Sequence, residues 1–256
     1  MDKSFSFEKG FAVVDADEPV YLETLRKEIF SITKDVFKLP NSEPEDGFNN
    51  FHTNIKDMTL GELNKFRIEL IQRITAECNV RELVFKAFEK RLLQMLGPDI
   101  LAQKNCNLVL QPPGDPNPSE LHRDAPANSP YELVVWVPLV NCFDTKAMYI
   151  VDIKKTEQAF EFLDANPADW AGFESYAKSI AVTPDVPFGK GLIFHTGCLH
   201  GSDINAENET RVSLNIRYKN IFSPSGLKSQ LQFFSPLRVS EVARLGSLLE
   251  ARELQK

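Results

Sequence analysis

The 256-residue sequence predicts an all-β core with flanking helices and a helical N-terminal region. Within residues 1–100, apolar residues recur at spacings of three and four, the period of an amphipathic helix. From Asn105 onward, short runs rich in β-branched and aromatic residues are separated by Pro, Gly, Asn and Asp, which is typical of strands joined by turns. We expect a single domain over residues 1–256, because this length and a 43% hydrophobic content allow one substantial core.

The N-terminal region is expected to contain helices that support the core. Their ranges are Pro19–Phe30, Leu60–Ala76 and Arg81–Leu96. Gly97-Pro98 ends the last of these helices, because glycine and proline commonly follow a helix C-terminus. Residues 41–47 read NSEPEDG, a composition that indicates a loop.

The core is expected over residues 105–220, built from short strands. Their sequences are NCNLVLQ, YELVVWVPLV, MYIVDI, SIAVTPDV, GLIFHT and RVSLNIRY. Two helical stretches, TEQAFEFLDAN and DWAGFESYAK, interrupt the strands between Thr156 and Lys178 and indicate an insertion or a lid. Residues 238–254 have the pattern of an amphipathic helix, which we expect to cover the core or a partner subunit.

Composition and charge exclude several classes of function. The chain carries 29 basic and 36 acidic side chains, a formal net charge of −7, so we expect no binding to nucleic acid or to an anionic membrane. The N-terminus lacks the pattern of a secretory signal, and no apolar run reaches the roughly 18 residues of a membrane span. The cysteines form no Cys-x-x-Cys pair, so we expect free thiols and a cytoplasmic location.

Two segments supply candidate metal ligands. In His122-Arg123-Asp124, the residues at positions i and i+2 of an extended backbone point to the same side, although such a pair alone is more often a solvated loop pair. His200 follows the predicted strand GLIFHT. Two neutral imidazoles and one carboxylate form the ligand set that binds iron(II) and leaves positions open for substrates. A structural zinc site would need a fourth protein ligand, and none is evident.

The segments LHRD, VVWVPL and HGSDIN…TRVSLNIRY resemble the iron(II)/2-oxoglutarate-dependent dioxygenases, and more narrowly their phytanoyl-CoA hydroxylase-like branch. The resemblance covers roughly residues 105–220. The pattern PANSPYELVVWVPL is also similar to oxygenases found among bacterial surface-carbohydrate genes. After the Trp-x-x-Leu strand, NCFDTKAMYIVD stands where the family commonly has a Gly-rich turn, so substrate specificity does not transfer from the better-known relatives.

The resemblance implies a fold, a metal and a cosubstrate. The fold would be a double-stranded β-helix, a jelly-roll or cupin-like barrel of two antiparallel sheets with the metal at its open end. His122, Asp124 and His200 would bind Fe(II), and Arg211 would pair with the distal carboxylate of 2-oxoglutarate. Family chemistry consumes O2 and by default hydroxylates a substrate.

The predicted strand at residues 211–218 alternates between polar and apolar residues. We expect the apolar face to pack on helices and the polar face to line a cavity, although a surface strand with its polar side in water has the same pattern. An arginine fork matches a carboxylate, and Ser213 could add a hydrogen bond beside Arg211.

The substrate is expected to be a small polar molecule such as a carbohydrate derivative. Asn215 and Arg217 continue the polar face beyond the cosubstrate anchor, and the proline-rich loop at residues 112–118 would form a stiff rim. The alternative is that Arg217 pairs with an acidic residue such as Glu120 or Glu132 and never contacts substrate.

Five further residues have weaker assignments. Asn107 and Gln111 share one face of NCNLVLQ and could hydrogen-bond the cosubstrate or substrate, with plain strand-edge roles as the alternative. His195 is expected to be a satisfied structural histidine, His52 a surface residue, and Trp136 a core residue between sheet and helices.

Two other functions stay open at this stage. One is a cupin-like metal isomerase or dioxygenase that works without 2-oxoglutarate, against which Arg211 and Ser213 argue, because such an enzyme needs no anchor for a diacid. The other is a non-catalytic binding module that has kept the barrel. The sequence identifies neither the primary substrate nor the carbon oxidised, and it leaves association into a homo-oligomer open.

Overall fold

The computed structural model describes residues 7–125, 128–226 and 230–253. Within these ranges, seven strands form one antiparallel sheet in the order β1-β6-β4-β8-β2-β9, and β3 pairs with β8 on the edge opposite β4. The bounds are β1 (Phe11–Asp15), β2 (Ile100–Gln103), β3 (Asn107–Gln111), β4 (Glu132–Pro138), β6 (Lys190–His195), β8 (Arg211–Asn220) and β9 (Phe234–Arg238). A second, two-stranded sheet pairs β5 (Tyr149–Ile150) with β7 (His200–Gly201).

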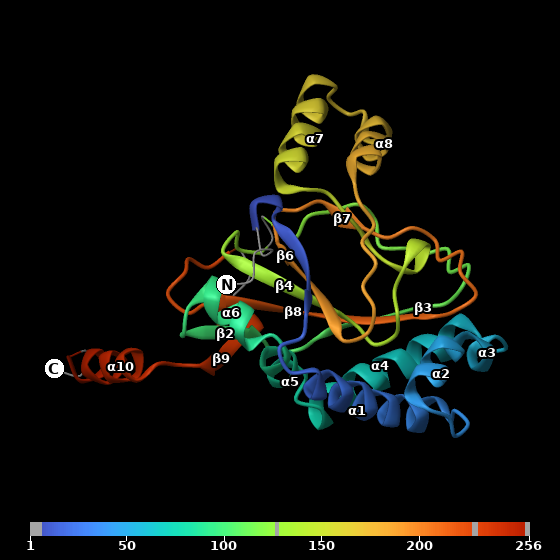
Figure 1. Cartoon of the computed structure of the whole chain (residues 1–256), viewed down its shortest axis with the longest axis horizontal. Coiled ribbons are helices and arrows are strands. Elements are labelled where there is room, and N and C mark those ends of the chain that lie inside the picture. Colours follow the sequence, from blue (N-terminus) through green and yellow to red (C-terminus); the bar gives the residue numbers. More distant parts are fainter. Residues whose placement is uncertain (1–6, 126–127, 227–229, 254–256) are drawn as a thin grey trace.

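Helices from the N-terminal region cover one face of the large sheet (Figure 1). They are α1 (Pro19–Phe37), α2 (Pro44–Asn49), α3 (Phe51–Ile55), α4 (Leu60–Glu77), α5 (Val80–Ala87) and α6 (Glu89–Leu96). The helices also bond directly to the sheet: Tyr218 of β8 donates a hydrogen bond to the Arg81 carbonyl of α5 over 2.7 Å. The main hydrophobic core lies between these helices and the sheet.

The remaining helices lie away from this face. The pair α7 (Ile153–Ala165) and α8 (Trp170–Ile180) stands on the side of β7, opposite α1 to α5 (Figure 1). Its own small hydrophobic cluster includes Leu121 and Leu199, the neighbours of the two candidate ligand histidines. The short α9 (Gln230–Phe233) precedes β9, and α10 (Glu241–Glu253) follows it. Among the described helices, none is both long and apolar enough to cross a membrane.

The predicted helix Arg81–Leu96 is wrong as a single element, because the backbone leaves helical geometry at Phe88, with φ −126°. The Phe88 side chain is fully buried and lies where a side chain at Gly191 of β6 would stand. The loop predicted at residues 41–47 is also wrong in part, since α2 begins at Pro44. Strand β1 lies within the region that was predicted to be mainly helical, and β2 begins at the last residue of that region.

The predicted strand SIAVTPDV is wrong. Helix α8 continues to Ile180, and the residues beyond it form isolated bridges at Val182 and Val186. Pro184 lies between these bridges, and a proline has no N–H to donate to a ladder. In MYIVDI the strand β5 stops at Ile150, because the Asp152 side chain already caps α7.

Candidate metal centre

His122, Asp124 and His200 form one cluster, in which each residue offers a ligand atom and all these atoms lie within 4.8 Å of one another. The backbone brings the histidines together: His122 N–H donates to the His200 carbonyl over 2.9 Å, and His200 N–H donates back over 2.8 Å. Asp124 lies two residues beyond His122, in the bend that follows it, and is mostly buried. The structure thus juxtaposes the three side chains that the sequence singled out.

Backbone carbonyls fix both imidazole rings. His122 Nδ1 lies 2.8 Å from the Glu120 carbonyl, and His200 Nδ1 lies 2.9 Å from the Cys198 carbonyl. A carbonyl accepts hydrogen bonds only, so each Nδ1 carries the proton and each Nε2 keeps its lone pair. Both rings are therefore in the tautomer that a metal requires at Nε2.

The electrostatic environment keeps His200 neutral. Burial, and secondarily the neighbouring His122 ring, lower the pKa of His200 to about 4. A neutral imidazole is the form that binds a metal ion, so this site needs no deprotonation of His200 at neutral pH.

The carboxylate of Asp124 has a strong partner on β8. Arg217 Nη2 donates to Asp124 Oδ1 over 2.6 Å, and both side chains are largely shielded from water. Pairing of Arg217 with an acidic residue was one of the two predicted alternatives, but the partner is Asp124 and not Glu120 or Glu132. The reason is register: Arg217 lies opposite Val134 of β4, and Glu132 instead accepts a hydrogen bond from the Ser129 backbone.

Arg211 is a buried arginine, with 4% of its surface exposed. Within the described part of the chain, no carboxylate is recorded within ion-pairing distance of its guanidinium. Nη1 and Nη2 make long contacts, 3.4 Å to the Ala147 carbonyl and 3.5 Å to Ser202 Oγ, and Nε has no partner. Burial lowers the pKa of Arg211, yet an arginine stays charged at any physiological pH. A buried positive charge with no ion-paired carboxylate among the described residues indicates a place for an anion.

Further polar atoms on the same face of β8 are buried without a partner. They are Ser213 Oγ, Asn215 Oδ1 and Arg217 Nε. The alternate residues of the strand, from Val212 to Tyr218, belong to the core that packs against the helices. The structure thus has the predicted arrangement, with the polar face toward the cavity and the apolar face toward the helices.

Asn107 and Gln111 lie at opposite ends of the cavity-facing side of β3. Asn107 is exposed and lines the cavity beside the histidines, whereas Gln111 is buried and donates to the Asp203 carbonyl over 2.9 Å. Gln111 Oε1 has no partner. The binding roles of both residues stay predictions.

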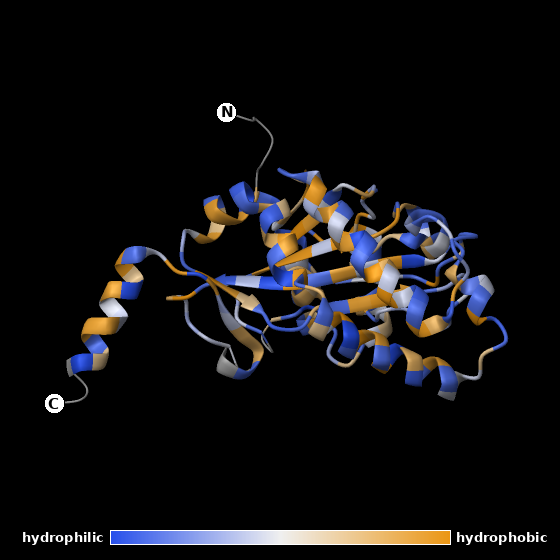
Figure 2. Cartoon of the chain, turned by 90° about the horizontal axis from the view of Figure 1, so that it is seen from below, coloured by the Kyte–Doolittle hydropathy of each residue, from blue (hydrophilic) through white to orange (hydrophobic). Residues whose placement is uncertain are grey.

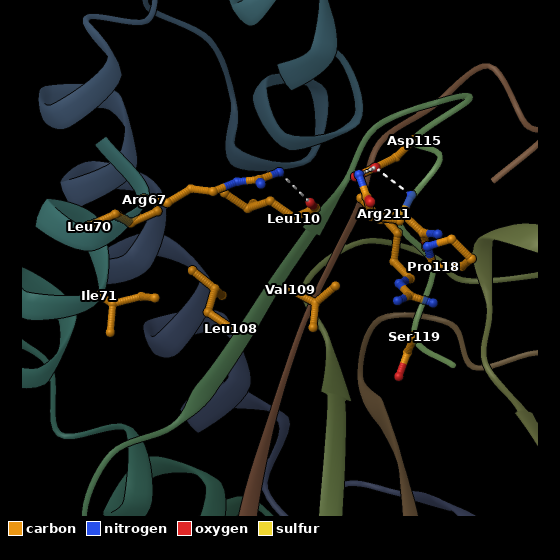
Figure 3. A pocket seen from close by; sticks show the side chains of 12 residues that line it. Arg67, Leu70, Ile71, Leu108, Val109, Leu110, Asp115, Pro118, Ser119 and Arg211 are labelled. Carbon is orange, nitrogen blue, oxygen red and sulfur yellow. Dashed lines mark hydrogen bonds between the residues drawn. The ribbon is translucent and has the colours of Figure 1, made fainter. Parts of the chain in front are cut away.

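A cavity of about 90 Å³ lies beside the metal cluster. Asn107, Asn215 and both candidate ligand histidines contribute to its lining, together with the apolar side chains of Trp136, Met148 and Phe194. A neighbouring cavity of about 310 Å³ shares Val109, Ser119 and Arg211 with it and extends over β3 toward α4 (Figure 3). Arg211 therefore stands at the junction of the two spaces.

Three other predictions can be compared with the structure. His195 has both ring nitrogens satisfied, by the Pro130 carbonyl at 2.6 Å and the Gly197 N–H at 3.0 Å, as expected for a structural histidine. His52 is half-buried, and its Nδ1 lies 3.0 Å from Thr210 Oγ1, so it keeps some surface exposure but is held to the loop before β8. Trp136 is buried as predicted but faces the cavity and not the helices, because it pairs in register with Asn215.

Gln103, whose Oε1 accepts hydrogen bonds from Arg217, was not predicted as a site residue. Met148 and Phe194 were likewise not predicted as cavity residues. Gln103 precedes the region predicted to be β-rich and carries no motif, so only its pairing in β2 reveals its position. Phe194 could have been found from the alternation of GLIFHT, which places it two residues from Leu192 on one face.

No family model matches the sequence, and no curated protein matches it. Among solved structures, the non-haem monooxygenase ThoJ in its nickel complex aligns with a TM-score of 0.53 and 18% identity, over 93% of this chain and 84% of ThoJ. The ThoJ apo structure aligns with a TM-score of 0.52 and 16% identity over the same shares of each chain. The α-ketoglutarate-dependent epimerase SnoN is more distant, with a TM-score of 0.46 at 16% identity over 83% of this chain and 79% of SnoN. Across nearly its whole length, this chain therefore has the fold of ThoJ.

Proposed function

We propose that this protein is an iron(II)- and 2-oxoglutarate-dependent oxygenase that hydroxylates a small polar metabolite or carbohydrate derivative. The proposal includes closure of the two sheets into a double-stranded β-helix and membership of the phytanoyl-CoA hydroxylase-like branch. The observation that carries it is a cluster of two histidines and one aspartate beside a buried arginine that lacks a carboxylate partner among the described residues. ThoJ, which has the same fold, is itself a non-haem monooxygenase with a structure as a nickel complex.

The residues present fit a divalent iron ion. Two imidazoles with Nε2 free and one carboxylate supply three ligand atoms, and the cluster found among the described residues contains no fourth protein ligand. A six-coordinate metal held in this way keeps open positions, as an oxygenase requires and a structural zinc site does not.

The residues around Arg211 fit 2-oxoglutarate. The unpartnered Nε of Arg211 and the unpartnered Oγ of Ser213 are both buried on the same face of β8. A carboxylate bound there would accept from both groups and neutralise the arginine. A metal isomerase without a diacid cosubstrate would leave this charge uncompensated, which favours the oxygenase.

Bound iron(II) and 2-oxoglutarate would supply the chemistry, which is reduction of O2 coupled to decarboxylation of the diacid to succinate. The residues of the chain would bind the metal, orient the diacid and shield both from water. The Glu120 and Cys198 carbonyls hold the imidazoles in one tautomer, and Arg211 orients the diacid. Trp136 and Phe194 exclude water from the cavity beside the metal.

The residues available to recognise a polar substrate differ from those that the sequence suggested. Arg217 is engaged by Asp124 and is therefore not a free substrate anchor. Asn107, which is exposed at the cavity, and Asn215, whose Oδ1 has no partner, remain as groups that could recognise hydroxyl or amide groups.

The test is formation of succinate from 2-oxoglutarate under air with iron(II). We expect wild-type turnover that is stimulated by a member of a panel of sugar nucleotides and free polar metabolites, and no turnover by Asp124→Ala or His200→Ala. His195→Ala serves as the matched histidine control and should keep metal binding. Stimulation by acyl-CoA esters alone would refute the polar substrate, and metal binding without any use of 2-oxoglutarate would refute the oxygenase.

A further inference from the structure

Arg217 contacts the carboxylate of a candidate metal ligand directly. Its Nη2 donates to Asp124 Oδ1 over 2.6 Å, and the exposed fractions of the two side chains are 12% and 9%. A short, shielded bond between two full charges is strong and directional, unlike an exposed surface ion pair. One oxygen of the carboxylate is thus committed to Arg217.

Gln103 holds Arg217 from the other side. Its Oε1 accepts from the Arg217 backbone N–H at 3.2 Å and from Nη1 at 3.4 Å. The Phe233 ring lies under the guanidinium, with its centroid 5.8 Å from Cζ. The fork of Arg217 is therefore fixed between β2 and the metal cluster, with one arm on Gln103 and the other on Asp124.

We infer that Arg217 is a positioning residue that restricts Asp124 to binding the metal through a single oxygen. This inference rests on the proposed function. A carboxylate can bind a metal ion through one oxygen or both, and a second bond would take a further coordination position. With Oδ1 held by Arg217, Oδ2 remains for the metal, and enough positions stay open for a two-atom chelating cosubstrate and O2.

The residue type supports this role. Arginine presents several donors in a rigid plane, so it can bond Gln103 and Asp124 together, whereas lysine presents a single point charge. A third cation on this face, the buried Lys219, donates to the Pro224 carbonyl over 2.8 Å. Lys219→Met is therefore the matched control, because it also removes a positive charge from β8.

The experiment uses the full chain loaded with cobalt(II), whose visible spectrum reports its ligand set. We expect Arg217→Met to bind cobalt(II) within about tenfold of wild type but with a visible spectrum different from that of wild type before any cosubstrate is added, because a second carboxylate oxygen would replace a water ligand. Its Kd for 2-oxoglutarate, measured by calorimetry, should rise about 10- to 100-fold. Arg217→Lys should recover part of both effects, and Lys219→Met should resemble wild type.

A wild-type cobalt spectrum in Arg217→Met would overturn the inference, even if 2-oxoglutarate bound more weakly, because that result would indicate direct contact between Arg217 and the cosubstrate. If Arg217→Met does not fold, Gln103→Leu is the second test. This variant keeps Arg217 and Asp124 but removes the hydrogen bonds that hold the Arg217 side chain in place. An unchanged cobalt spectrum in Gln103→Leu would then overturn the inference. Failure of the proposed function is distinguishable, since wild-type protein would then bind cobalt(II) without binding 2-oxoglutarate.

Discussion

Two arginines on one face of β8, both largely shielded from water, have different partners, and this difference indicates their roles. Arg217 forms a 2.6 Å ion pair with Asp124, while Arg211 has only long contacts, to the Ala147 carbonyl and to Ser202 Oγ, and no ion pair with a described carboxylate. The charge of Arg217 is therefore neutralised by its own protein, whereas the charge of Arg211 remains available to an anionic ligand. The sequence pattern alone cannot make this distinction, because both residues alternate identically along β8.

Arg211→Met should weaken 2-oxoglutarate binding strongly while leaving metal binding intact. Truncating one partner of a buried, hydrogen-bonded charge pair costs about 2–5 kcal/mol. Arg211 does not contact the metal cluster, so cobalt(II) should bind as in wild type. Calorimetric titration of 2-oxoglutarate into the cobalt-loaded variant measures this effect. Equal affinity in variant and wild type would show that another residue anchors the diacid.

His200 should make the metal-free protein less stable in acid. Its pKa is lowered to about 4, mainly by burial, whereas an unfolded histidine has a pKa of about 6.5. Between these values the unfolded chain binds the proton and the folded chain does not, so the free energy of unfolding falls as pH decreases. From pH 7 to pH 5 the loss is on the order of 2 kcal/mol.

Urea unfolding of metal-free wild type and His200→Gln at both pH values tests this expectation. The variant lacks the titrating group and should lose about 2 kcal/mol less than wild type over the same interval. Parallel losses in the two proteins would mean that His200 is already protonated in the folded state at pH 5.

At the scale of secondary structure elements, the strands that carry the site were predictable and the boundaries of the helices were less so. Strand β8 has a strict period of two, so both its existence and its faces follow from the sequence. The division between α5 and α6 does not, because the periodicity continues across Phe88 and the break depends on packing against Gly191 from a distant strand. The pairing of Arg217 with Asp124, 93 residues apart, is equally nonlocal.

The contact between α5–α6 and β6 gives a prediction for Gly191. An added Cβ at this position would lie 2.6 Å from the ring of Phe88, which is fully buried and cannot move aside cheaply. Gly191→Ala should therefore lower the free energy of unfolding by about 1–3 kcal/mol, the usual cost of overpacking.

Thermal unfolding of Gly191→Ala beside Gly61→Ala measures this cost. A Cβ at Gly61 of α4 meets nothing within 4 Å, and alanine is the better helix former, so that variant should be neutral or more stable. Equal unfolding temperatures for Gly191→Ala and wild type would show that Phe88 can reposition without cost. The side chain of Phe88 would then not explain the break between the helices.

At the scale of the whole molecule, α10 stands apart from the sheet and its covering helices. Figures 1 and 2 show it projecting away from the rest of the chain in two perpendicular views. Its apolar residues are exposed, with Val242 at 81%, Leu245 at 57% and Leu249 at 61%. The helix does not cover the core, which was one of the two predicted positions, and a place on a partner subunit remains a prediction.

We expect the leucines of α10 to contribute little to the stability of the folded chain. Their side chains are already in water, so Leu245→Ala with Leu249→Ala should change the free energy of unfolding by no more than about 0.5 kcal/mol. Leu92→Ala in α6, where the side chain is fully buried, is the matched control and should cost about 2–5 kcal/mol. Sedimentation of the same proteins tests the association of identical copies: if wild type forms dimers through α10, the double variant should dissociate while its monomer stays folded. A loss of stability as large as that of Leu92→Ala in a monomeric protein would instead mean that α10 packs against its own chain in solution.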